Sequence, residues 1–85
     1  MTKFNSPERL RTIVRLAASM TEISFAKAWL LDDPQGKWEM RALKLLETVQ
    51  QSPSYNDMTS IDINEGIATA LTFLAVESIY RSTQN

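Results

Sequence analysis

The chain has 85 residues and a net charge of −1, and it contains neither cysteine nor histidine. This composition excludes disulfides, thiol chemistry and the usual zinc, copper and haem sites, and it removes the commonest general base. An apolar share of 44% with 22% charged residues is typical of a small globular protein, so we expect a single domain over residues 1–85.

No targeting or membrane segment is predicted. Residues 1–5 are polar apart from Met1 and Phe4, and no apolar signal region with a cleavage site follows them. The longest apolar run is about half of the roughly 20 residues that a helix needs to span a bilayer. We therefore expect no membrane association and a cytoplasmic location.

The first predicted helix covers residues 7–31. Ser6 is suited to cap it and Pro7 to occupy its first position, and apolar residues then recur at helical spacing. An alternative is a break near Ser19 to Thr21, with Thr21 capping a second short helix. We favour the continuous helix.

The second predicted helix covers residues 34–51, with Asp33 as its cap and Pro34 at its first position. The short connection before it predicts a helical hairpin with the first helix. Trp29 and Trp38 flank this connection, and large aromatic side chains usually supply core burial. The alternative is that they anchor a partner at the surface.

The third predicted helix covers residues 62–81 and begins at Ser60 or Asp62. Asp62 and Glu65 have the spacing of a capping box. Between residues 67 and 76, only two threonines carry a polar side-chain group, so this helix lacks the charged face of a surface helix. We expect it to be buried on nearly all sides, by the rest of the chain or by a second molecule.

These elements predict an all-α fold, an antiparallel helical bundle of three main helices that is either complete as a monomer or completed by homodimerisation, and we favour the dimer. Large exposed apolar patches usually mark interfaces, and a small chain without disulfides often gains stability by association. The residues expected at this oligomer interface lie on the third helix and are Gly66, Thr69, Ala70, Thr72, Phe73, Val76 and Tyr80.

Two groups of residues are candidates for partner binding. Arg9, Arg11 and Arg15 form the basic cluster of the first helix, and planar guanidinium groups suit carboxylates and phosphates. A solvated helix face is the ordinary alternative. Tyr55 and Met58 lie in the long connection before the third helix, where they form a contact surface or fold back over the end of the bundle.

No catalytic, cofactor or metal site is expected. The chain has no phosphate-binding glycine loop, and a helical bundle of this size has little room for a ligand pocket. The sequence predicts a non-enzymatic protein–protein interaction module, that is, an adaptor, a regulator or an inhibitor of a larger complex. Small inhibitors encoded by phages have a similarly featureless composition.

Two alternatives remain open. One is a regulator that binds nucleic acid through the arginine-bearing face of the first helix. Nucleic acid is the less favoured partner for two reasons. The net charge of the chain is near neutral, and the turn of a possible helix-turn-helix, which would approach the phosphates, is acidic. The other is a structural subunit of a larger assembly, in which a different chain covers the third helix.

Overall fold

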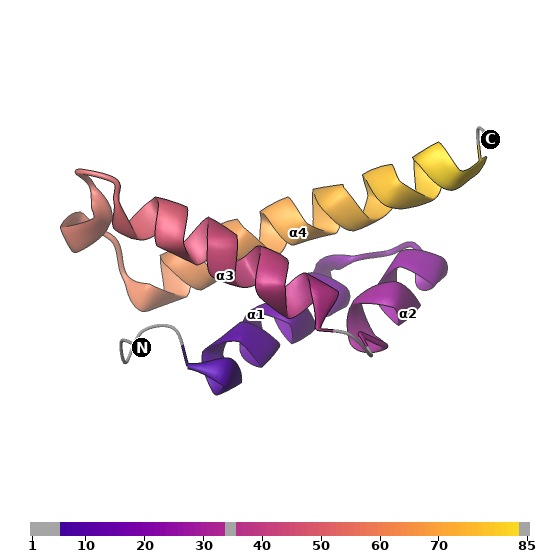
Figure 1. Cartoon of the computed structure of the whole chain (residues 1–85), viewed down its shortest axis with the longest axis horizontal. Helices are drawn as coiled ribbons and strands as arrows, with labels where there is room; N and C mark the ends of the chain where they lie inside the picture. Colours follow the sequence, from indigo (N-terminus) through magenta and orange to yellow (C-terminus); the bar gives the residue numbers. More distant parts are fainter. Residues whose placement is uncertain (1–5, 34–35, 84–85) are drawn as a thin grey trace.

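The computed structural model describes residues 6–33 and 36–83, and this part of the chain consists of helices and their connections. In chain order the helices are α1 (Pro7–Met20), α2 (Ser24–Leu31), α3 (Lys37–Gln50), the short 3₁₀ helix η2 (Tyr55–Asp57) and α4 (Ser60–Thr83). No strand is present in these residues, so the all-α prediction is confirmed for them. Helices α1 and α4 run in the same direction and α3 runs the opposite way (Figure 1).

Helix α1 begins as the sequence predicts. The Ser6 side chain accepts a hydrogen bond from the backbone N–H of Arg9 (3.2 Å), and Pro7 occupies the first turn. Ser6 thereby satisfies one of the backbone donors that a helix start leaves without an intrahelical partner.

The continuous helix over residues 7–31 is wrong, because α1 ends at Met20 and α2 begins at Ser24. Thr21 and Ile23 adopt extended backbone conformations between the two helices. The buried Thr21 hydroxyl donates to the carbonyl oxygen of Ala17 (2.8 Å), so this residue ends α1 instead of capping α2. Because of the break, α2 folds back and buries Ala26 and Leu30 in the common core. A straight helix would carry these two residues past the core.

The side chain of Asp33 caps the first backbone donors of α3, but the N-cap position is Gly36 and the helix begins at Lys37, three residues later than predicted. The Asp33 carboxylate accepts hydrogen bonds from the backbone N–H groups of Lys37 (2.7 Å), Trp38 (2.8 Å) and Glu39 (3.3 Å). Gly36 precedes the helix with a φ of 67°, a conformation that suits glycine. The predicted role of Pro34 falls outside the described residues.

Helix α4 begins at Ser60, one of the two predicted starts, but its cap is Thr59. The Thr59 hydroxyl accepts a hydrogen bond from the backbone N–H of Asp62 (3.0 Å). The capping box that we expected from Asp62 and Glu65 is therefore wrong, and Asp62 lies in the first turn, where its charge suits the helix dipole.

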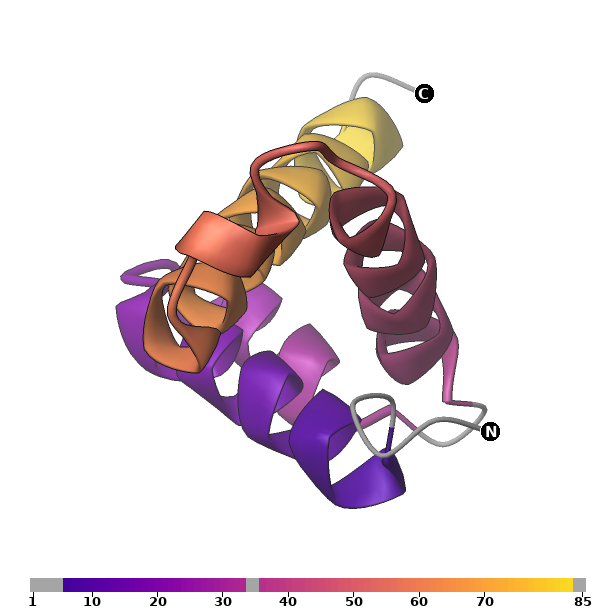
Figure 2. The ribbon, with the colours of Figure 1, turned by 90° about the vertical axis from the view of Figure 1, so that its left-hand side faces the viewer.

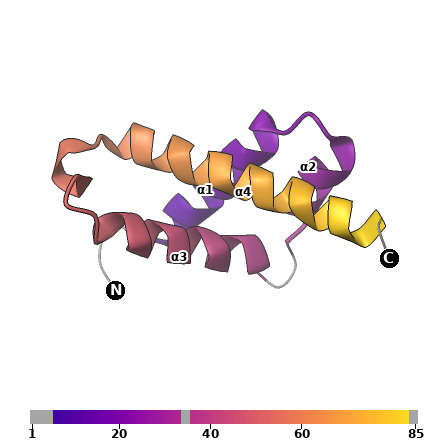
Figure 3. The ribbon, with the colours of Figure 1, turned by 90° about the horizontal axis from the view of Figure 1, so that it is seen from above.

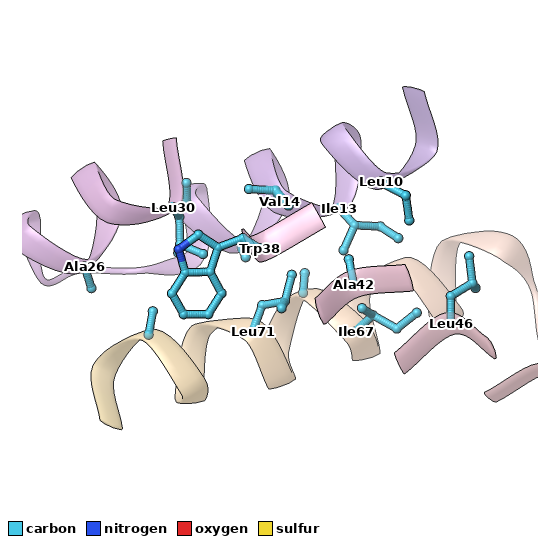
Figure 4. Close-up of a cluster of buried hydrophobic side chains, with 14 of the residues drawn as sticks. Leu10, Ile13, Val14, Ala26, Leu30, Trp38, Ala42, Leu46, Ile67 and Leu71 are labelled. Carbon is cyan, nitrogen blue, oxygen red and sulfur yellow. The ribbon is translucent and has the colours of Figure 1, made fainter. Parts of the chain in front are cut away.

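Side chains from all four α-helices meet in one core. Four of them, one from each helix, are fully buried: Ile13, Leu30, Leu46 and Leu71. Trp38 is 3% exposed and lies beside Leu30 and Leu71 (Figure 4). Seen along the molecule, α1, α3 and α4 form three sides around this core (Figure 2).

Two hydrogen bonds fix how α1 lies against α4. Arg9 Nε donates to Asn64 Oδ1 (3.0 Å), and the Thr72 hydroxyl lies 3.2 Å from the carbonyl oxygen of Ala17. Both pairs are separated by 55 positions, so the two helices lie side by side and run in parallel.

Helix α4 is longer than the helices that cover it. Its 24 residues extend about 36 Å, whereas the 14 residues of α1 and of α3 each extend about 21 Å. The C-terminal part of α4 therefore continues past the N-terminal end of α3 (Figures 1 and 3). This difference gives the molecule its elongated shape, 41 × 23 × 21 Å.

Candidate interaction surfaces

One side of α4 faces away from the other helices. Phe73 is 71% exposed and Tyr80 is 63% exposed, while Thr69 is exposed and Val76 is half-buried. Their spacing of four, three and four residues places these side chains on one stripe of the helix. We call Thr69, Phe73, Val76 and Tyr80 the outer stripe of α4. The rest of the chain therefore does not bury α4 on nearly all sides, and its burial by a second molecule stays a prediction.

Thr72, another residue of the expected interface, belongs to the interior contacts of the chain. It is half-buried, and its hydroxyl lies within hydrogen-bonding distance of the carbonyl oxygens of Ala68 (2.9 Å) and Ala17 (3.2 Å). Thr72 thus faces α1, whereas Thr69 and Phe73 of the same expected interface are exposed.

An apolar groove lies between α3 and α4, next to the outer stripe. It has a volume of about 220 Å³. Its lining consists of apolar side chains, one glycine and one carboxylate at the rim: Leu45, Val49, Met58, Asp62, Ile63, Gly66, Ile67 and Ala70. Gly66 and Ala70, two small residues of the expected interface, therefore both lie at this groove.

The two residues singled out in the connection before α4 have different roles. Tyr55 is half-buried and packs against the core, so it folds back over the end of the helices. Met58 is 39% exposed and lines the apolar groove. The groove combines Met58 with α3 and α4, and an exposed methionine adapts readily to the shape of a bound side chain.

The arginine cluster of α1 is divided between two sides of the molecule. Arg9 is half-buried and donates to Asn64 on α4. Arg11 and Arg15 are exposed and line a hollow of about 170 Å³ between α1, α2 and the start of α3. Asp33 and Glu39 line the same hollow, so its charge is mixed. Mixed charge offers a phosphate backbone little net attraction.

The two tryptophans differ in burial. Trp38 belongs to the core. The guanidinium carbon of Arg41 lies 5.2 Å from its ring centroid, and the ammonium nitrogen of Lys37 lies 5.6 Å from it. Trp29 is half-buried, and its ring centroid lies 5.5 Å from that of Phe25, which is 59% exposed. The prediction of core burial is confirmed for Trp38 and holds in part for Trp29.

Exposed apolar residues also surround α2, and none of them was among the predicted binding residues. Besides Phe25, these are Met20, Ile23 and Leu31, which are 44–59% exposed. A signal was present, because Lys27 is the one charged residue of this eight-residue helix. This scarcity of charge is not apparent when residues 24–31 are assigned to a longer amphipathic helix.

Other classes of site find little support in the described residues. Across residues 6–33 and 36–83, no group of three or more acidic side chains is arranged to hold a metal ion. In the same part of the chain, every helix is too short or too polar to cross a bilayer. Comparison with protein-family models, curated proteins and solved structures found no match to this chain.

Proposed function

We propose that this chain is a non-enzymatic protein–protein interaction module of the cytoplasm, an adaptor, regulator or inhibitor of a larger complex. The observation that carries the proposal is the position of Phe73, a large aromatic side chain that is 71% exposed on α4, three residues after Ala70, which lines the apolar groove. Aromatic side chains that enter a pocket of the partner are frequent energetic centres of protein interfaces. The partner-binding surface is the outer stripe of α4 together with the α3–α4 groove.

The size of the α3–α4 groove supports binding of a protein there in preference to a small substrate. The groove measures about 220 Å³. Pockets for small molecules usually measure about 300–1,000 Å³ and enclose most of the ligand. An open groove of this size suits single side chains projecting from another protein.

A homodimer that completes the antiparallel bundle is part of this proposal. The exposed aromatic side chains of Phe73 and Tyr80 on one side of α4 support it, because large exposed apolar patches usually mark interfaces.

Phe73→Glu tests the proposal, with Met40→Glu as the matched control. Met40 is 55% exposed on α3 and does not line the groove, so both variants place a carboxylate at an exposed apolar position. Immobilised wild-type chain and Met40→Glu should retain the same proteins from an extract of the source cells, and Phe73→Glu should lose them.

The binding constants of the retained proteins, once purified, complete the test. Loss of an aromatic hot spot typically costs about 2 kcal/mol or more, so Phe73→Glu should raise each Kd about 30-fold or more. Equal affinity of wild type and Phe73→Glu for every retained protein would remove the outer stripe as the binding surface.

A further inference from the structure

The connection between α1 and α2 lacks the usual signals that end one helix and start the next (Figure 1). It consists of residues 21–23 and contains neither glycine nor proline. Ile23 occupies the N-cap position of α2 without a side-chain capping bond, and no basic residue lies in the last turn of α1. By contrast, Ser6, Asp33 and Thr59 cap the other three α-helices. The local sequence therefore does not require α1 and α2 to separate here.

Three backbone donors at this connection lack protein partners. Among the described residues, the backbone N–H groups of Glu22, Ile23 and Ser24 have no hydrogen-bond acceptor. All three residues are exposed, so the donors face solvent. In a continuous helix, the same donors would bond the carbonyl oxygens of residues 18–20. Joining α1 to α2 would thus add helical hydrogen bonds that the folded-back form does not have.

Within a single chain, the packing of α1 prevents this joining. Ile13 and Ala17 are fully buried, and Arg9 Nε donates to Asn64 Oδ1 on α4 (3.0 Å). A straight helix over residues 7–31 would draw α1 away from α4 and expose these groups. Two copies avoid that loss if the α1 of each copy packs on α2, α3 and α4 of the other. Every contact of α1 is then formed again, between the copies instead of within one.

We propose that two copies of the chain exchange α1, and that α1 and α2 form one continuous helix in each copy of the exchanged dimer. Exchange of an identical element is a low-cost route to a dimer, and a short hinge connection favours it. The partner surface is defined by the fold, because the exchanged α1 occupies the site that α1 fills in the single chain. The inference is independent of the proposed function, since neither the outer stripe of α4 nor the α3–α4 groove contains a residue of α1.

Two exposed apolar residues at the connection agree with this exchange. Met20 is 44% exposed and Ile23 is 45% exposed. In the exchanged dimer, both joining segments run between the same two bodies, so the Met20 and Ile23 of one copy lie near those of the other. Contact between these side chains would remove apolar surface from water, which favours the dimer.

Ser24→Pro tests the exchange, with Ser60→Pro as the matched control. Each serine is exposed and is the first residue of its helix, a position that accepts proline. The extended conformation of Ile23 also suits the residue before a proline. Both variants should therefore fold as single chains. In a continuous helix over residues 7–31, however, a proline at position 24 would be an interior residue and would break the helix.

The assay is heating of a concentrated solution to its unfolding midpoint, followed by cooling and size-exclusion chromatography. Wild type and Ser60→Pro should give a dimer that persists on dilution, because its return to the monomer requires α1 to leave the other copy. In Ser24→Pro, the cost of proline inside a helix should lower the association constant of the dimer about 100-fold or more. Absence of a dimer in wild type, or an equal constant in wild type and Ser24→Pro, would contradict the exchange.

A cross-link identifies the copy on which α1 packs. The chain has no cysteine of its own, and the side chains of Arg9 and Asn64 meet between α1 and α4. In the double variant Arg9→Cys/Asn64→Cys, a short bismaleimide should join the two thiols within one chain in the monomer and between two chains in the isolated dimer. A denaturing gel of the dimer should therefore show covalent dimers. Internally linked monomers alone would mean that the copies associate without exchanging α1.

The exchanged dimer can be distinguished from a dimer formed through the outer stripe of α4. Phe73 is 71% exposed and lies outside the joined segment, so Phe73→Glu should leave the association constant of the heat-formed dimer unchanged. Loss of that dimer in Phe73→Glu would assign it to the outer stripe and would contradict the exchange.

Discussion

Asp33 offers the sharpest test of how the sequence sets the helix boundaries. Its carboxylate accepts three backbone N–H bonds at the start of α3, two of them shorter than 3 Å. Loss of a helix cap costs about 1 kcal/mol, and loss of a favourable charge at a helix N-terminus costs about 0.3–1 kcal/mol more. We expect Asp33→Ala to lower the free energy of unfolding by about 1.5 kcal/mol. A chain of this length is usually stable by roughly 4–13 kcal/mol.

Asp32→Ala is the matched control, because it removes the same charge one residue earlier. Asp32 is exposed, and its backbone N–H bond to Ala28 persists with alanine. Urea unfolding should place Asp32→Ala within about 0.5 kcal/mol of wild type. Thermal unfolding of Asp33→Ala should occur about 6–12 °C lower at an unchanged m-value. Equal destabilisation by the two variants would refute the capping role.

Three further predictions concern α4 and the tryptophans. Gly66→Ala should raise the free energy of unfolding by about 0.5–1 kcal/mol, because the added Cβ meets no atom of the chain. A loss of stability in urea unfolding would show a close neighbour there. Thr72→Arg should destabilise the monomer by about 1–3 kcal/mol, since Thr72 packs against α1, whereas Thr69→Arg at an exposed position should change it by less than about 0.5 kcal/mol. In Trp29→Phe the remaining indole is the buried Trp38, so its fluorescence should be blue-shifted and poorly quenched by acrylamide. In Trp38→Phe the remaining indole is the half-buried Trp29, so acrylamide should quench its fluorescence more readily. Similar quenching of the two variants would place both indoles in similar surroundings.

The sequence predicts the helices well where capping chemistry and apolar spacing agree. Ser6 with Pro7 and Asp33 both carry recognisable start signals, and both act as caps in the structure. The break between α1 and α2 contains neither glycine nor proline. Tertiary packing explains this break, because ending α1 at Met20 lets Leu30 reach the core. The local sequence carries no signal for this burial.

The candidate surface could be predicted only in part. Residue spacing predicted an interface on the last long helix and included the small residues Gly66 and Ala70 in it. It could not decide which side of that helix faces α1, because an almost uniformly apolar helix has no periodic signal. The hydrogen bond from Thr72 to α1 settles this orientation, and it turns Phe73 outward.

The mass of the chain in solution tests most directly whether the outer stripe of α4 binds a partner copy. Light scattering of the wild-type chain over a range of concentrations should reach twice 9.7 kDa, and Phe73→Glu should remain near 9.7 kDa under the same conditions. A wild-type mass of 9.7 kDa throughout, or a dimer that Phe73→Glu leaves intact, would contradict this assembly.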